Sequence, residues 1–158
     1  MRILGIDPGL AATGYGFLDV TDEGVNCGTV GIIQTTTGAI ADRLRTIFLE
    51  MKAILERERP QEVAVEEGFY SKNVKVALSL GQARGAVLLA CSLAKVPIYE
   101  YSPREVKLST VGNGAASKQQ VNYMITSLLN LAEPPATDDI SDALAVAYCH
   151  YLKRENRF

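Results

Sequence analysis

Hydrophobic and polar positions change period after the first quarter of the 158-residue chain. The short apolar run at residues 2–6 is followed at once by Asp7, Pro8 and Gly9, which is typical of a buried strand ended by a turn. Two further strands are expected at 13–20 and 25–34, separated by the turn sequence TDEG. The chain is therefore predicted to open with an antiparallel meander.

From about residue 39 the apolar residues recur at helical spacing, which predicts an amphipathic helix over 39–58 that Pro60 closes. The elements expected after it are a strand over 62–67, an apolar helix over 76–95, a strand over 97–101, a helix beginning at the capping pair Ser117 and Gln120, and a last helix beginning near Thr137. A meander followed by strand and helix alternation indicates an α/β fold, a mixed sheet with helices on its faces.

Length and composition favour one folded unit. A chain with 47% hydrophobic residues and no linker or repeat is predicted to form a single domain over residues 1–158. No uninterrupted apolar run of about 18 residues and no basic leader are present, so we expect no membrane association and a cytoplasmic location. Cys27, Cys91 and Cys149 lie among apolar neighbours and are expected to be reduced core thiols. His150 is the sole histidine, which argues against histidine-based metal or triad chemistry.

The net charge of −2 argues weakly against a nucleic-acid partner, but the distribution of charge changes this picture. If four of the 18 acidic residues hold metal, the 16 basic residues outnumber the remaining 14. A local basic surface beside an acidic pocket is then compatible with the composition. The basic residues near the candidate segments are Lys72, Lys75, Arg84, Arg104, Lys107 and Lys118.

Carboxylates stand at the ends of three predicted elements. Asp7 ends the first strand, Glu66 ends the strand at 62–67, and Asp139 and Asp142 open the last helix. Neighbouring strand ends and a helix start packed beside them would bring four carboxylates into one cavity, where only a positive charge could compensate them. Hard oxygen ligands of this kind favour Mg²⁺ or Mn²⁺. Taken singly, each acid has an ordinary alternative as a turn acceptor, a solvated strand end or a helix-start residue.

The sequence TDDISD leaves open which acids of the last helix hold metal. Asp139 and Asp142 are three residues apart and Asp138 and Asp142 four apart, and both spacings place a pair on one helix face. The apolar stripe of the helix places Asp138 further toward solvent, where capping the helix with Thr137 suits it better. We therefore favour Asp139 and Asp142.

Several ordered motifs resemble one enzyme family. The segments GIDPG, TGYG, AVEEGF, LGQARG, VKLSTVGNGAASKQQV and DISDALAVAYCH occur in the order and spacing of the RuvC family of bacterial Holliday junction resolvases. The resemblance spans nearly the whole chain. It implies an RNase H-like mixed five-stranded sheet with helices on both faces, a homodimer, and metal-dependent nicking of two strands of a four-way DNA junction. It further implies a branch-migration helicase partner of the RuvA and RuvB type.

The resemblance also assigns residues. Asp7, Glu66, Asp139 and Asp142 match the family's catalytic acids and would hold two Mg²⁺ ions per site, with Mn²⁺ as an alternative, Asp7 bridging the two. The matching lysines of the family lie near the scissile backbone, so catalytic and phosphate-contacting roles are implied for Lys107 and Lys118. Without the resemblance, both would be interpreted as solvated surface lysines. The expected DNA-binding set is Phe69, Tyr70, Lys72, Lys75, Arg104, Lys107 and Lys118.

The segment after the strand at 62–67 contains two adjacent aromatic residues, Phe69 and Tyr70, in a polar, lysine-containing stretch. One is a candidate for stacking on a base, and the family places a functional aromatic at the position of Phe69. The other is expected to anchor the segment to the core, and the sequence leaves open which does which. In the following helix, Gly81 and Gly85 would permit close approach of a second helix, and the resemblance places the dimer contact on this element.

Three alternative functions share some of these sequence features. An actin-like ATPase shares the GIDPG motif but needs two such domains, for which 158 residues leave no room. An RNase H-like nuclease acting on RNA or on single strands would use the same acids and is the stronger alternative. A catalytically silent junction-binding module is disfavoured because all four acidic positions are filled.

Overall fold

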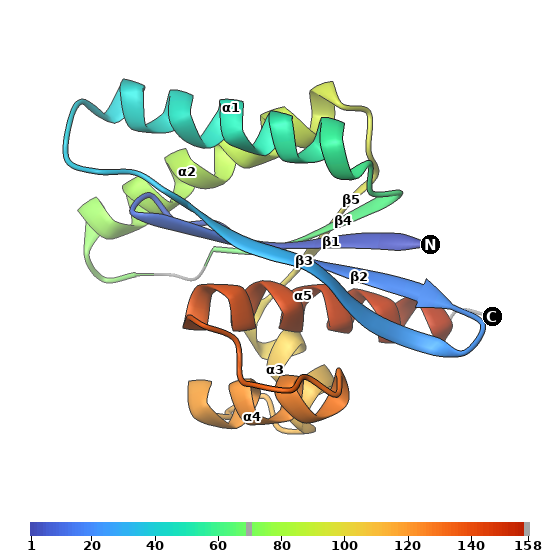
Figure 1. Cartoon of the computed structure of the whole chain (residues 1–158). Coiled ribbons are helices and arrows are strands. Elements are labelled where there is room, and N and C mark those ends of the chain that lie inside the picture. The colour runs from blue at the N-terminus through green and yellow to red at the C-terminus, as the bar shows by residue number, and fades with distance from the viewer. Residues whose placement is uncertain (69–70, 157–158) are drawn as a thin grey trace.

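The structure, a computed structural model, describes residues 1–68 and 71–156. A three-stranded meander opens the chain, the elements α1, β4, α2 and β5 then alternate, and three consecutive helices follow (Figure 1). The strands are β1 (Arg2–Asp7), β2 (Ala12–Thr21), β3 (Gly24–Gln34), β4 (Glu62–Glu66) and β5 (Ile98–Tyr101). The helices are α1 (Ile40–Glu58), α2 (Val74–Leu93), α3 (Pro103–Val111), α4 (Lys118–Leu128) and α5 (Asp138–Glu155).

The strands form one mixed sheet in the order β3-β2-β1-β4-β5. β1, β2 and β3 pair antiparallel, whereas β4 pairs parallel with both β1 and β5. Helices α1 and α2 cover one face of the sheet, α5 covers the other, and α3 and α4 pack on the outside of α5 (Figure 1). The predicted mixed five-stranded sheet with helices on both faces is confirmed.

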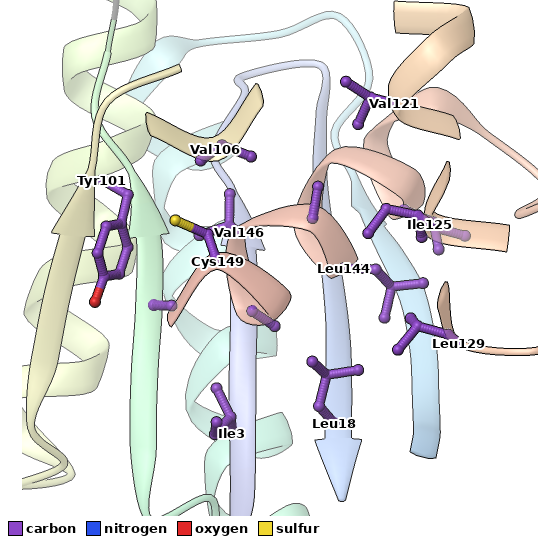
Figure 2. Close-up of a cluster of buried hydrophobic side chains, with 14 of the residues drawn as sticks. Ile3, Leu18, Tyr101, Val106, Val121, Ile125, Leu129, Leu144, Val146 and Cys149 are labelled. Atoms are coloured by element: carbon purple, nitrogen blue, oxygen red, sulfur yellow. The ribbon is translucent and has the colours of Figure 1, made fainter. Parts of the chain in front are cut away.

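Alternation along the central strand β1 divides the core into two layers. Leu4 and Ile6 point toward α1 and α2, while Ile3 joins the cluster between the sheet and α5. Figure 2 shows this second cluster, in which Leu144 of α5 lies between the strands and the side chains of α4. Because successive side chains face opposite ways, every second residue of β1 is directed at α5.

Close packing of α5 on the sheet depends on glycine. A Cβ atom added at Gly5 of β1 would lie 2.0 Å from the carbonyl oxygen of Ala143, and one at Gly14 of β2 would lie 2.1 Å from that of Asp139. No side chain fits in either place. Gly5 and Gly14 therefore admit the helix that carries two of the candidate acids.

One helix was not predicted from the sequence. α3 begins at Pro103 and is capped by Ser102, whose side chain accepts from the backbone N–H of Glu105 while the Glu105 side chain accepts from that of Ser102. This capping box with proline at the first helical position was a readable signal. α2 also differs from expectation, because it begins two residues earlier, where Asn73 caps it.

Within the described residues, α2 is the one helix long and apolar enough to cross a membrane by length and composition. Core helices of soluble proteins pass the same test, so this is weak evidence. Ala83, Val87 and Cys91 of α2 are buried against the sheet. Leu78 and Leu89 remain exposed, which leaves an apolar surface on this side of the molecule.

Candidate active site

Three elements end or begin at the same edge of the sheet. β1 and β4 are parallel neighbours that finish at Asp7 and Glu66, and α5 starts beside them at Asp138 (Figure 1). Asp7 pairs across the sheet with Gly14, the residue that lies against the backbone of Asp139. The sheet register therefore brings the end of β1 next to the first turn of α5.

Successive side chains of a strand point to opposite faces of the sheet, and this alternation decides which way these carboxylates point. Val63 and Val65 of β4 are buried toward α1 and α2, so Glu62 and Glu66 lie on the α5 side. Glu62 verifies this direction, because its carboxylate contacts Arg154 of α5 at 3.2 Å. In β1, Asp7 shares a face with Gly5, which touches α5.

A cleft of about 460 Å³ opens where these elements meet. Asp7, Glu66 and Asp142 line it, together with Lys107 of α3 and Lys118 of α4. Five residues predicted from the sequence for catalysis thus surround one cavity. The remaining lining residues are Pro8, Glu67, Gly68, Leu80, Pro103, Val106 and Val121, which the sequence reasoning did not place there.

Crowding of the carboxylates changes their acidity. Burial and the charges of Glu66, Asp142 and Asp139 raise the pKa of Asp7 to about 8. Burial, followed by the charge of Asp142, raises the pKa of Glu66 to about 7. The pKa of Asp142 is raised as well, chiefly by burial. Acids that repel one another in this way need a nearby positive charge if all of them are to be ionised.

Lysine supplies part of this compensation. Lys118 Nζ donates to Asp142 Oδ2 at 3.1 Å, and this contact raises the pKa of Lys118. The Lys118 side chain is 64% exposed and that of Asp142 is 19% exposed, so the pair lies at the mouth of the cleft. Lys107 of α3 also lines the cleft, and the charges of Lys118 and Lys107 both lower the pKa of Glu66.

The donor set fits a hard divalent cation in chemistry and in charge. All four candidate acids offer carboxylate oxygen, and burial together with the neighbouring carboxylates raises the pKa of Asp7 and of Glu66. In the described part of the chain, no three His, Cys, Asp or Glu side chains are gathered closely enough to hold one ion. A bound cation would supply the positive charge that these acids lack.

The start of α5 separates the three acids that the sequence left ambiguous. Thr137 is the N-cap and accepts from the Ile140 backbone N–H at 3.3 Å. Asp142 lines the cleft, whereas neither Asp138 nor Asp139 is among its lining residues. Asp138 is exposed and its charge helps to raise the pKa of Asp142, while the charge of Asp139 helps to raise that of Asp7. The choice of Asp139 over Asp138 stays a prediction.

The remaining predicted DNA-binding residues lie around the cleft or outside the described residues. Lys72 and Lys75 are exposed at the start of α2, and Lys75 lines a shallow cleft that shares Leu80 with the acidic one. Arg104 is exposed on α3. Phe69 and Tyr70, the two candidate stacking residues, fall outside the residues that the structure describes.

His150 lies away from this cleft. Its Nδ1 is 2.7 Å from the Tyr101 hydroxyl and its Nε2 is 2.7 Å from Glu62 Oε2, and the side chain is 2% exposed. The histidine thus joins α5 to β4 and β5. The expectation that it takes no part in metal chemistry remains a prediction.

Gly14→Ala is expected to lower cleavage at least tenfold and to destabilise the fold by about 1–3 kcal/mol, the usual cost of overpacking. The added methyl meets the Asp139 carbonyl oxygen, so the start of α5 must move away from Asp7. Cleavage rate and denaturant unfolding measure the two effects. Gly28→Ala is the matched control, because there the nearest atom is the flexible Asp19 carboxylate. Unchanged cleavage by Gly14→Ala would show that the start of α5 tolerates displacement.

Comparison with known proteins agrees with this architecture. The sequence profile of the family "Crossover junction endodeoxyribonuclease RuvC" matches residues 3–150. The RuvC of Carboxydothermus hydrogenoformans is 48% identical over 153 residues, which cover 97% of each chain. The RuvC of Pelotomaculum thermopropionicum is 45% identical over 151 residues, 95% of this chain and 92% of that protein.

A solved structure shares the fold over nearly the whole length. Thermus thermophilus RuvC in complex with a Holliday junction substrate superposes with a TM-score of 0.92 at 34% identity, covering 99% of this chain and 96% of that one. The expected RNase H-like fold is thereby confirmed. The chain belongs to the RuvC family of crossover junction endodeoxyribonucleases.

Proposed function

We propose that this crossover junction endonuclease hydrolyses the DNA backbone with a carboxylate site made of Asp7, Glu66, Asp139 and Asp142, which holds divalent cations. The observation that carries the proposal is the crowding of these acids at one edge of the sheet, which raises the pKa of Asp7 to about 8 and that of Glu66 to about 7. Acids in a cleft whose pKa values are raised by burial and by one another are typical of functional sites.

An oxygen-only donor set favours Mg²⁺, for which we propose two ions per site, with Mn²⁺ as an alternative. When bound, such ions lower the pKa of a water molecule and stabilise the charge of the leaving oxygen. Histidine is then not required as a base, in keeping with the distance of His150 from the cleft.

The chain's own residues orient the substrate and stabilise charge. Lys107 and Lys118 both line the cleft, where each would contact a phosphate and stabilise the negative charge that develops on it. Pro8, Leu80 and Val106 add apolar surface to the cleft lining. The acids accept hydrogen bonds from the attacking water and direct it at phosphorus.

Recognition of the junction is assigned to residues that surround the cleft. Positive side chains at the start of α2 and on α3 would follow the phosphate backbone away from the scissile bond. Their exposure and the position of Lys75 beside the acidic cleft support this role. The proposed contacts are Phe69, Tyr70, Lys72, Lys75, Arg104, Lys107 and Lys118.

A cleavage assay tests the proposal against its alternatives. Purified protein is incubated with a four-way junction, a linear duplex of the same sequence, a single strand and an RNA–DNA hybrid, each with Mg²⁺ and with EDTA. We expect paired nicks in the junction alone, and only with Mg²⁺. Preferential cleavage of the hybrid or of the single strand would favour an RNase H-like nuclease of different substrate class. Binding of the junction with no cleavage would indicate a silent binding module.

We propose that the enzyme acts as a homodimer through α2. Leu78, Leu89 and Leu93 are exposed on this helix, and a two-fold dimer would present two sites to symmetry-related strands. We expect light scattering to give twice the chain mass at micromolar concentration, and Leu89→Glu to give monomers that lose paired nicking. Leu49→Glu on α1, also exposed, is the control. A wild-type monomer that still nicks in pairs would contradict this prediction.

Phe69→Ala is expected to lower cleavage about tenfold or more while changing junction affinity little, because phosphate contacts dominate affinity. Tyr70→Ala is the comparison that tells which of the adjacent aromatics stacks on a base. Single-turnover cleavage and band-shift titration measure the two quantities. If Phe69→Ala cleaves like wild type but unfolds at a much lower temperature, the ring belongs to the core instead.

Three wider assignments rest on the family. We infer that residues 1–158 form a single nuclease domain, which the one continuous sheet supports. A branch-migration helicase complex of the RuvA and RuvB type is the inferred partner. Because bacterial relatives of this family act on DNA, we infer a cytoplasmic location.

A further inference from the structure

α3 is a nine-residue helix that presents one side to the cleft and another to α5. An isolated helix of nine residues is only marginally stable in water, so tertiary contacts must hold α3 in its orientation. Val106 and Thr110 are buried, and the Thr110 hydroxyl donates to the Val106 carbonyl at 2.9 Å. These two residues anchor the helix axis, whereas its rotation depends on the side chains at its edges.

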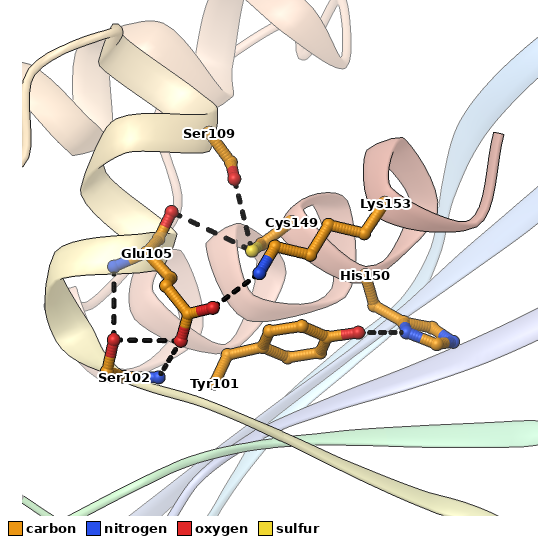
Figure 3. Close-up of polar contacts among 7 residues, drawn as sticks. All are labelled: Tyr101, Ser102, Glu105, Ser109, Cys149, His150 and Lys153. Carbon is orange, nitrogen blue, oxygen red and sulfur yellow. Dashed lines mark hydrogen bonds and ion pairs between the residues drawn. The ribbon is translucent and has the colours of Figure 1, made fainter. Parts of the chain in front are cut away.

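Glu105 makes the most extensive set of contacts at that edge. Its Oε2 accepts from the Ser102 backbone N–H at 3.0 Å and from the Ser102 hydroxyl at 2.8 Å, and its Oε1 accepts from Lys153 Nζ of α5 (Figure 3). One turn further on, Ser109 Oγ lies 3.2 Å from Cys149 Sγ, also of α5. The same edge of α3 is thus joined to the second half of α5 at two levels.

Lys107 follows Glu105 by two residues and therefore lies about 200° around the helix from it. It lines the cleft and its charge lowers the pKa of Glu66, whereas Glu105 does not line the cleft. A small rotation of α3 would leave Glu105 near α5 but would swing the long Lys107 side chain along the cleft wall. The direction of Lys107 is accordingly sensitive to the contact on the far side of the helix.

We propose that Glu105, held by Lys153, is a positioning residue that fixes the rotation of α3 and so keeps the Lys107 ammonium group facing Glu66. The inference rests on the function proposed above for Lys107. Glu105 touches no reacting atom, so its effect passes entirely through the lysine. Lys153 belongs to α5, the helix that also carries Asp139 and Asp142. The contact of Glu105 with Lys153 would therefore set the position of Lys107 relative to the helix that holds these two acids.

The charge and the solvent exposure of the Glu105–Lys153 pair are consistent with a role in positioning Lys107. Hydrogen bonds from Lys153 and Ser102 lower the pKa of Glu105 to about 2, so the carboxylate stays ionised wherever the fold persists. The Lys153 side chain is 36% exposed and that of Glu105 is 43% exposed, and pairs so accessible to water add little to stability. Loss of the pair should therefore disturb geometry without unfolding the chain.

The test compares variants that break the pair with one that keeps it. Glu105→Gln preserves the capping box but removes the charge, Lys153→Gln removes the other partner, and Lys153→Arg retains the ion pair. We expect both glutamine variants to slow single-turnover cleavage of a four-way junction about tenfold, with junction affinity within twofold of wild type. Lys153→Arg should restore at least half of the rate. Glu56→Gln, which breaks the exposed Lys52 pair on α1, is the control.

A double substitution shows whether the effect passes through Lys107. If Glu105 only positions that lysine, Glu105→Gln slows the wild type but produces no further loss in a Lys107→Ala background. An equal loss in both backgrounds, or glutamine variants that cleave like wild type, would overturn the inference. A Lys107→Ala variant with full activity would overturn both this inference and the role proposed for Lys107. A wild-type protein that fails to cut junctions would instead refute the proposed function.

Discussion

Asp142→Asn is expected to abolish cation-dependent cleavage of a four-way junction, lowering the rate by about 10³-fold or more. Asparagine keeps the shape of the side chain but removes the charge and one acceptor oxygen from a cleft that Asp142 shares with Asp7 and Glu66. Asp139→Asn should have the same effect. Junction binding without divalent cations should be unchanged or slightly tighter, because a negative charge near phosphate is lost.

Asp138→Asn is the matched control, since it makes the same chemical change one residue away. Asp138 is exposed in the first turn of α5 and does not line the cleft, while Thr137 caps the helix. We expect cleavage within about twofold of wild type, the range usual for exposed substitutions. Cleavage assays and band shifts on the three variants decide the assignment. An active Asp139→Asn beside an inactive Asp138→Asn would show that the acidic motif was placed one residue out.

Asp7→Asn is expected to stabilise the cation-free protein at pH 8 while abolishing cleavage. The pKa of Asp7 is about 8 in the folded chain, against an ordinary value of 3.8. Because the folded state then holds a proton that the unfolded state releases, stability is full below about pH 4 and is lost as the pH rises toward 8. At 1.36 kcal/mol per pKa unit, and allowing for relaxation of the site, the loss is on the order of 3 kcal/mol.

The difference in unfolding free energy between wild type and Asp7→Asn isolates this titration. Urea unfolding in EDTA is measured at intervals from pH 4 to pH 8. Across this range the unfolding free energy of the variant should rise steadily relative to that of wild type. Subtraction cancels groups that do not interact with Asp7, including Glu105, whose lowered pKa acts in the opposite sense. The carboxylates coupled to Asp7 contribute to the difference together with it. Mg²⁺ added at pH 8 should stabilise wild type but not the variant. Asp22→Asn, in the exposed turn after β2, is the control. A difference that stays flat across the window would contradict the crowded site.

Local pattern was sufficient for most of the fold. The short apolar runs of β1 and β4, the helical spacing over 39–58 and the helix start near Thr137 are all visible in residues a few positions apart, because turn residues bound a buried strand and burial of one helix face dictates a period of 3.6. α3 was not predicted because its nine residues include too few apolar positions to show a helical period. Ser102, Pro103 and Glu105 nevertheless form a recognisable helix start. The helix that carries Lys107 was therefore not expected from the sequence.

The acidic site was only half determined by sequence. Strand ends and the helix start located Asp7, Glu66 and the acids of TDDISD, and both the apolar stripe of the helix and the family motifs favoured Asp139 and Asp142. The packing of α5 depends on Gly5 and Gly14, whose need for space arises from a helix more than a hundred residues away. No local pattern could predict that closeness.

The sequence by itself determined which elements form and that their ends carry carboxylates, because propensity and periodicity act between residues a few positions apart. Only the tertiary structure decided how acidic those carboxylates are, which charges act on which acid, and that Glu105 of α3 meets Lys153 of α5. Burial and charge act through space, between atoms that the sheet order and the packing of α5 bring within a few ångströms. That is why the site's chemistry followed from the fold rather than from the order of residues.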